Sequence, residues 1–67
     1  MRLAEYLARE GLTHRQFAAR LRASQASVSR YAAGERFPEP RMLALIEEET
    51  GGKVTADDFM RQWKRSA

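Results

Sequence analysis

Apolar residues recur along this chain at the three- and four-residue spacing of helices that bury one face. No segment shows the alternation of a half-buried strand, so the pattern predicts an all-α fold of five short helices. These helices are expected over residues 2–9, 14–21, 25–33, 40–50 and 56–64. The positions expected to face inward in the first four are Leu3, Tyr6, Leu7, Phe17, Ala18, Leu21, Val28, Tyr31, Met42, Leu43, Leu45 and Ile46.

Polar residues between these helices indicate where three of them begin. Thr13 is followed three residues later by Gln16, and Thr55 by Asp58, which is the spacing of a capping box. Ser24 is suited to cap the helix over residues 25–33, because its hydroxyl can accept a hydrogen bond from a first-turn backbone N–H. Capping chemistry and apolar periodicity therefore predict the same starting points.

The chain has the pattern of a helix, a three-residue turn and a second helix over about residues 14–33. Ala18 is small where the two helices must touch, and Val28 is the apolar anchor of the second helix. One face of the second helix is then free to enter the major groove of DNA. We expect residues 1–67 to form one domain built around this helix-turn-helix.

The composition argues against several other classes of protein. The chain has no cysteine, so a disulfide framework, a zinc finger and a thiol nucleophile are impossible. No apolar run approaches the roughly 20 residues that cross a membrane, and the charged start does not resemble a signal peptide. We expect a soluble cytoplasmic protein that does not contact the membrane.

No group of residues suggests catalysis. Asp57 and Asp58 begin a helix and have no partner base or metal-binding set near them in the pattern. The only histidine, His14, has no partner acid, so the serines have no base to activate them. We therefore expect no enzymatic activity, no metal, no cofactor and no small-molecule effector.

Charge is distributed unevenly along the chain. The net charge is +3, and residues 1–36 carry seven arginines against three glutamates, while residues 37–67 have a slight acidic excess. A polyanion would be drawn to the basic half, which holds the helix-turn-helix pattern. A solvated charged surface would explain the charge equally well, so charge alone does not decide between the two.

The residue types of the second motif helix suit the reading of base pairs. Glutamine can make paired hydrogen bonds to adenine, arginine can do so to guanine, and a small apolar residue can contact the methyl group of thymine. The expected base contacts are Gln25, Ala26, Ser27 and Arg30. The expected contacts to the DNA backbone are His14, Arg15, Arg22, Ser24, Ser29 and Arg36.

Other roles are open for several charged and polar residues. Gln25 could be solvated at the start of its helix, and Arg30 could pair with Glu35 instead of meeting DNA. His14 could be a plain exposed residue of a first helical turn. The acidic run Glu47–Glu49 is expected to be a solvated face turned away from DNA.

Taken together, these features resemble the Cro/repressor-like (Xre-type) helix-turn-helix family of phage and bacterial transcription regulators. The resemblance covers nearly the whole chain and implies a lambda-repressor-like DNA-binding domain. The matching features are Leu12-Thr13, Phe17-Ala18, the segment 24–30, the loop 34–38, an apolar fourth helix, and the ending from Val54 to Phe59.

The resemblance also implies roles for individual residues. Base contacts are implied for Gln25, Ala26 and Arg30. A phosphate contact is implied for His14, which would also brace Gln25, and a backbone contact for the loop at Arg36.

Arg22 departs from the family pattern, which usually has glycine at this turn position. The position commonly needs a left-handed backbone, which costs a non-glycine residue about 1 kcal/mol. We interpret Arg22 as a tolerated variant that gains a phosphate contact.

The last helix carries Phe59, Met60 and Trp63, which could all be core residues. A domain this small rarely buries so many large residues in its last helix, so we expect part of this set to form a dimer interface.

The sequence therefore predicts a repressor that binds an inverted-repeat operator in double-stranded DNA as a homodimer, in a bacterial cell or a phage-infected host. The alternative is a protein-interaction module of the same fold, such as an antitoxin or a polymerase- or toxin-binding protein. The small polar face of residues 25–33 favours DNA, since an apolar face would have favoured a protein partner.

Overall fold

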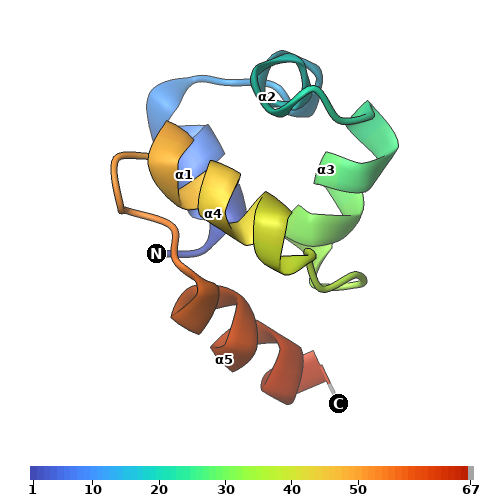
Figure 1. Cartoon of the computed structure of the whole chain (residues 1–67), viewed down its shortest axis with the longest axis vertical. Helices are drawn as coiled ribbons and strands as arrows, with labels where there is room; N and C mark the ends of the chain where they lie inside the picture. The colour runs from blue at the N-terminus through green and yellow to red at the C-terminus, as the bar shows by residue number, and fades with distance from the viewer. Residues whose placement is uncertain (67) are drawn as a thin grey trace.

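The computed structural model describes residues 1–66, with side chains up to Trp63, and this part of the chain contains five helices and no strand (Figure 1). The helices are α1 (Leu3–Glu10), α2 (His14–Leu21), α3 (Gln25–Ala33), α4 (Pro40–Glu49) and α5 (Ala56–Ser66). The expected all-α fold is confirmed. The bounds of α2 and α3 are as predicted, α1 is shifted by one residue, α4 ends one residue earlier, and α5 continues past residue 64. No helix in the described part is long and apolar enough to cross a bilayer.

The two helices of the helix-turn-helix begin with the predicted side-chain caps. The Thr13 hydroxyl accepts from the Gln16 N–H at 3.0 Å, and the Gln16 side chain accepts from the Thr13 N–H at 2.9 Å. The Ser24 hydroxyl accepts from the Ser27 N–H at 3.1 Å. These bonds satisfy N–H groups that a helix leaves without partners, so they fix where α2 and α3 start.

Apolar residues from all five helices share one core. Phe17 from α2, Val28 from α3 and Ile46 from α4 are fully enclosed, and Tyr6 packs edge-on against Phe17 with ring centroids 6.2 Å apart. The other buried apolar residues are Leu3, Leu7, Ala18, Leu21, Tyr31, Ala32, Val54 and Phe59. Because α2 and α3 both contribute to this core, the packing that stabilises the protein also fixes how the two helices cross.

The role expected for Phe59 in a dimer interface is wrong. Its side chain is 4% exposed and belongs to the core, whereas Met60 and Trp63 are 46% and 43% exposed. α5 turns Phe59 inward together with Gln62, which lies three residues later on the same face. Of the three residues expected at the interface, only Met60 and Trp63 have surface to offer a second subunit.

Contacts with the end of α3 hold α5 in this orientation. The Gln62 side chain is buried, and its Nε2 donates to the Ala32 carbonyl at 3.1 Å. Gly34 has φ of +76°, and a Cβ there would lie 2.9 Å from Gln62 Nε2, so glycine is required for this close approach. The Trp63 ring meets Phe37 of the following loop edge-on, with centroids 6.1 Å apart.

The start of the chain is tied to the start of α5. The Met1 ammonium donates to the Lys53 carbonyl at 2.8 Å and lies 3.1 Å from Asp58 Oδ2, beside the connection between α4 and α5 (Figure 1). Asp58 also accepts from the Thr55 N–H at 2.9 Å, as the predicted capping box requires. Partial burial acts to raise the pKa of Asp58, but the hydrogen bonds from Thr55 and the ammonium outweigh it and lower this pKa below its ordinary value.

The lowered pKa of Asp58 makes stability depend on pH. Ionised Asp58 stabilises the folded state fully above its ordinary pKa of 3.8, and this stabilisation is lost as the pH falls through the lower pKa of the folded state. We expect Asp58→Asn to reduce the free energy of unfolding at neutral pH by about 1–2 kcal/mol, as loss of a helix cap usually does. Urea unfolding at a series of pH values should also show a weaker acid dependence in the variant.

Asp57→Asn is the matched control for this experiment. The Asp57 carboxylate is 68% exposed and pairs with Arg61 at 2.9 Å on the surface of α5. Surface pairs of this kind contribute little, so we expect a change below about 1 kcal/mol and an unaltered acid dependence. Equal effects of the two substitutions would contradict the role given to Asp58.

Candidate nucleic-acid interface

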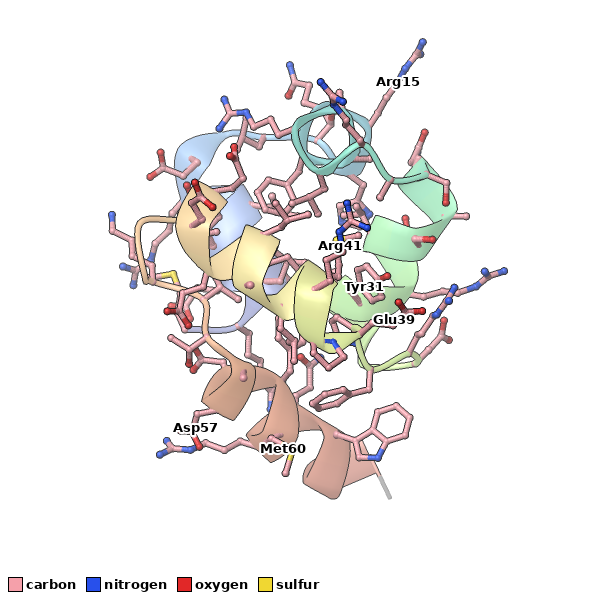
Figure 2. All side chains as sticks on the ribbon, viewed as in Figure 1. Arg15, Tyr31, Glu39, Arg41, Asp57 and Met60 are labelled. Carbon is pink, nitrogen blue, oxygen red and sulfur yellow. The ribbon has the colours of Figure 1, made fainter. Side chains whose placement is uncertain are left out.

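α3 presents a polar, small-residue face to solvent, opposite the face that enters the core. Val28 and Tyr31 are buried, and Tyr31 points from α3 toward α4 (Figure 2). Gln25, Ala26 and Arg30 are exposed. Residues 26 and 30 are four apart, so they lie above one another on the same face, with Gln25 beside them in the first turn.

Hydrogen bonds within the protein engage all three serines expected at DNA. The Ser24 hydroxyl donates to the Ser27 hydroxyl at 2.9 Å, which leaves the Ser27 proton free to donate elsewhere. The Ser29 hydroxyl lies 2.8 Å from Nδ1 of His14 in a half-buried contact.

His14 was expected to contact Gln25, but its imidazole contacts Ser29 instead. No hydrogen bond joins His14 to Gln25 among the described residues, because the imidazole is engaged one turn further along α3. Gln25 and Ser29 are four residues apart and share a face of α3. Which of the two the His14 side chain reaches therefore depends on how α2 crosses α3. The bond fixes the start of α2 against the middle of α3 and leaves the Gln25 amide unengaged.

The turn between α2 and α3 has the expected left-handed residue. Arg22 has φ of 55° and ψ of 39°, and it is the only non-glycine residue with positive φ in the described chain. The Ala23 N–H donates to the Ala18 carbonyl at 2.9 Å, which closes the last turn of α2. The Arg22 side chain remains exposed at the surface.

Arginine side chains of the motif and of the loop after it take part in no ion pair among the described residues. The arginines in question are Arg15, Arg22, Arg30 and Arg36. All are exposed, and Arg15 projects outward from α2 in Figure 2. Arginine ion pairs within the described residues occur at Arg9 of α1 and Arg61 of α5, so the considered pair between Arg30 and Glu35 is not formed. The unpaired arginines can therefore attract a polyanion.

This geometry defines a helix-turn-helix, with two capped helices crossing over a shared core and the outer face of the second left free. A family model described as a helix-turn-helix domain matches residues 1–47, and the chain belongs to this family. The match ends within α4, so α5 lies beyond it. No curated protein and no solved structure matches the chain significantly. Membership of this family indicates a DNA-binding regulator.

Three residues whose positions matter in the structure were not predicted from the sequence. Gln62 fastens α5 to α3, and its spacing of three from Phe59 is the signal that could have revealed it. Arg20 and Arg41 border a groove between α2 and α4. This groove is formed by the packing of two helices that are distant in sequence, so no local sequence pattern could have predicted it.

Proposed function

We propose that this protein is a transcriptional repressor of the Cro/repressor-like (Xre-type) group that binds an inverted-repeat operator as a homodimer. The observation that supports it best is the outer face of α3, where Gln25, Ala26 and Arg30 are exposed and free of partners in the described chain. Binding across a promoter would exclude RNA polymerase, which is the simplest way for a protein with this surface to act.

In this proposal, α3 lies in the major groove. Gln25 donates to and accepts from an adenine edge, and Arg30 donates to the two acceptors of guanine. Ala26 is small enough to let the helix approach and to contact a thymine methyl group. Ser27 donates its free proton to a base near the start of the helix.

The DNA backbone is held around this helix. If Ser29 donates to Nδ1 of His14, the neutral imidazole carries its proton on Nε2 and can donate it to a phosphate at the start of α2. Free N–H groups at that helix end add a favourable dipole. The other proposed backbone contacts are Arg15, Arg22, Arg36 and Ser24, which would act through its backbone N–H because its hydroxyl proton is engaged with Ser27.

A second copy is required because one helix-turn-helix reads only a few base pairs. Met60 and Trp63 are the large apolar residues that stay exposed, and both lie on α5, away from the outer face of α3. We propose that a twofold interface there spaces two α3 helices about 10 base pairs apart on one side of the DNA, which is the separation that half-sites of such dimers require.

Selection of bound sequences from random duplex DNA tests the proposal. We expect an enriched inverted repeat with half-sites separated by about one helical turn. Enrichment of no sequence, together with capture of a protein partner by the same surface, would instead support a protein-interaction module.

The proposed phosphate contacts predict a change in salt dependence. Each lost contact reduces the slope of log K against log salt by about 0.9, so a substitution present in both subunits of a homodimer should reduce it by about 1.8 and weaken binding to all sequences alike. We expect this result for Arg36→Ala and for Arg22→Gly, which removes the charge while relieving the left-handed strain. Arg9→Ala on α1 is the control and should leave the slope unchanged. Unchanged slopes in all three variants would rule out both contacts.

A further inference from the structure

A groove of about 500 Å³ lies between the end of α2 and the start of α4. Its border carries the exposed side chains of three arginines and one glutamate, Arg20, Arg22, Arg41 and Glu39, and Leu21, Met42 and Leu45 line its apolar floor. Of the arginines, Arg22 is the one proposed above to contact a phosphate. Arg41 lies on α4 on the side that faces α2 (Figure 2). Three arginines against one glutamate give the rim a net positive charge, which suits an acidic surface that also offers apolar groups. We call this the basic groove.

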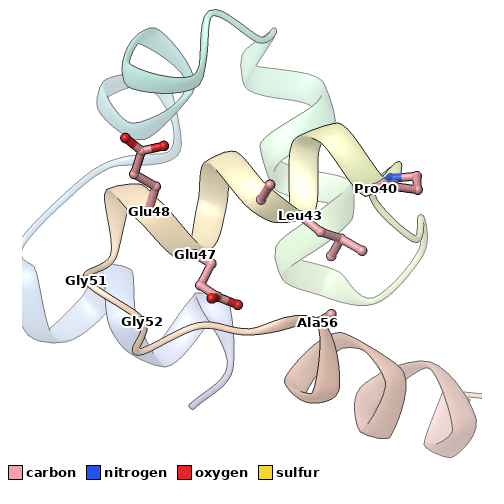
Figure 3. A pocket seen from close by; sticks show the side chains of 8 residues that line it. Pro40, Leu43, Glu47, Glu48, Gly51, Gly52 and Ala56 are labelled. Carbon is pink, nitrogen blue, oxygen red and sulfur yellow. The ribbon is translucent and has the colours of Figure 1, made fainter.

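A second groove, of about 530 Å³, lies along the other flank of α4, where the chain returns toward α5 (Figure 3). Leu43 and Ala44 contribute apolar surface here, and Glu47 and Glu48 are exposed at its border. Figure 3 shows Glu47 pointing toward the start of α5. We call this the acidic groove.

The charges of the two grooves are not neutralised within one chain. Among the described residues, neither the three arginines of the basic groove nor Glu47 and Glu48 take part in an ion pair. The period of a helix places Met42 and Leu45 on one flank of α4 and Leu43 and Glu47 on the other. The two grooves therefore face different directions, so they can meet only when they belong to two molecules.

We propose that the acidic groove of one copy docks on the basic groove of a second copy, and that this contact makes adjacent operators fill cooperatively. Because two different surfaces meet, each copy keeps one groove free for the next copy, and the contact can extend along DNA. It is separate from the twofold interface at Met60 and Trp63. The cooperative role rests on the proposed DNA-binding function, whereas the contact itself does not.

The contact is expected to be weak in the free protein, because exposed ion pairs contribute little individually. Two proteins on neighbouring operators hold the grooves at a high effective concentration, so a weak contact becomes visible there. We expect the parent protein to fill a tandem operator with a cooperativity factor of about 5 to 150, the usual range of coupling between two binding events.

Charge reversal provides the test. One variant carries Arg20→Glu and Arg41→Glu, and the other carries Glu47→Arg and Glu48→Arg. Each variant alone brings like charges together, so its cooperativity factor on the tandem operator should fall to about 1. A single operator, titrated with each variant, is the reference that removes general effects of net charge. Circular dichroism checks that these surface changes leave the fold intact.

Complementation distinguishes this contact from general electrostatics. An equal mixture of the two variants pairs opposite charges at each junction between unlike variants, and one protein that carries all four substitutions does so at every junction. The mixture should regain part of the parent's cooperativity and the fully reversed protein all of it, and added salt should weaken both. Independent filling by the parent at every operator spacing would overturn the proposal. Equal losses on single and tandem operators after the arginine changes would also overturn it, because the arginines would then contact phosphates.

A measurement without DNA separates this proposal from the proposed function. Sedimentation at low salt should show association beyond the twofold dimer in the mixture and in the protein with four substitutions, but not in either variant alone. If no operator can be selected, this result still supports the contact and only the DNA-binding proposal fails. Absence of such association in the mixture and in the fully reversed protein, together with independent filling of operators, would reject the contact.

Discussion

Gln25→Ala and Arg30→Ala are each expected to abolish tight binding to the selected operator while leaving the fold unchanged. Each removed base contact costs about 1–3 kcal/mol, and a homodimer loses the contact twice. The affinity should therefore fall by roughly 30-fold to 10⁴-fold. Neither side chain has a hydrogen-bond partner or ion pair in the described chain, so stability should change by less than about 0.5 kcal/mol.

Operators with single base changes show whether the two residues read sequence. Loss of Gln25 should relax the preference at one base pair of each half-site, and loss of Arg30 at another. Arg9→Ala makes the same change on α1, where the arginine pairs with Glu5 at 3.1 Å, and it should leave the preference intact. If both α3 variants bind the operator as tightly as the parent, then α3 does not read DNA.

The helix-turn-helix could be predicted in detail because two independent signals agree there. Apolar spacing gives the inward faces of α2 and α3, and the caps at Thr13 and Ser24 give their first residues. The left-handed conformation of Arg22 was also predictable, since the turn between the helices requires it whatever residue is present. The bounds of α1 are less well defined by the sequence, because this helix begins without a side-chain cap. α4 begins at Pro40 as predicted, and only its last residue differs.

The partners of individual side chains could not be predicted in the same way. His14 reaches Ser29 and not Gln25 because of the crossing of α2 over α3, and nothing local in the sequence reports that crossing. The rotation of α5 is a similar case. On a helix, the residue three positions after Phe59 and the residue four positions after it could each share its buried face. The hydrogen bond from Gln62 to Ala32 turns Gln62, three positions later, toward the core. Trp63 is thereby left half-exposed.

Trp63→Ala is expected to weaken a homodimer without unfolding the monomer. In the described chain, Trp63 packs edge-on against Phe37, and losing such a pair costs about 0.5–1.5 kcal/mol. A tryptophan buried at the centre of an interface contributes about 2 kcal/mol or more, so the dimer should dissociate roughly 30 times more readily. Met60→Ala leaves the pair with Phe37 intact and should weaken the dimer in the same direction.

Phe59→Ala separates an interface role from a core role. Truncating a buried phenylalanine costs about 3–5 kcal/mol, while a chain of this length is stabilised by only roughly 3–10 kcal/mol in total. This variant should therefore be largely unfolded in urea titrations that leave Trp63→Ala folded. Sedimentation with and without operator then measures the dimer. A parent protein that is monomeric at high micromolar concentration, and that saturates a single half-site as readily as the full repeat, would exclude the interface at Met60 and Trp63.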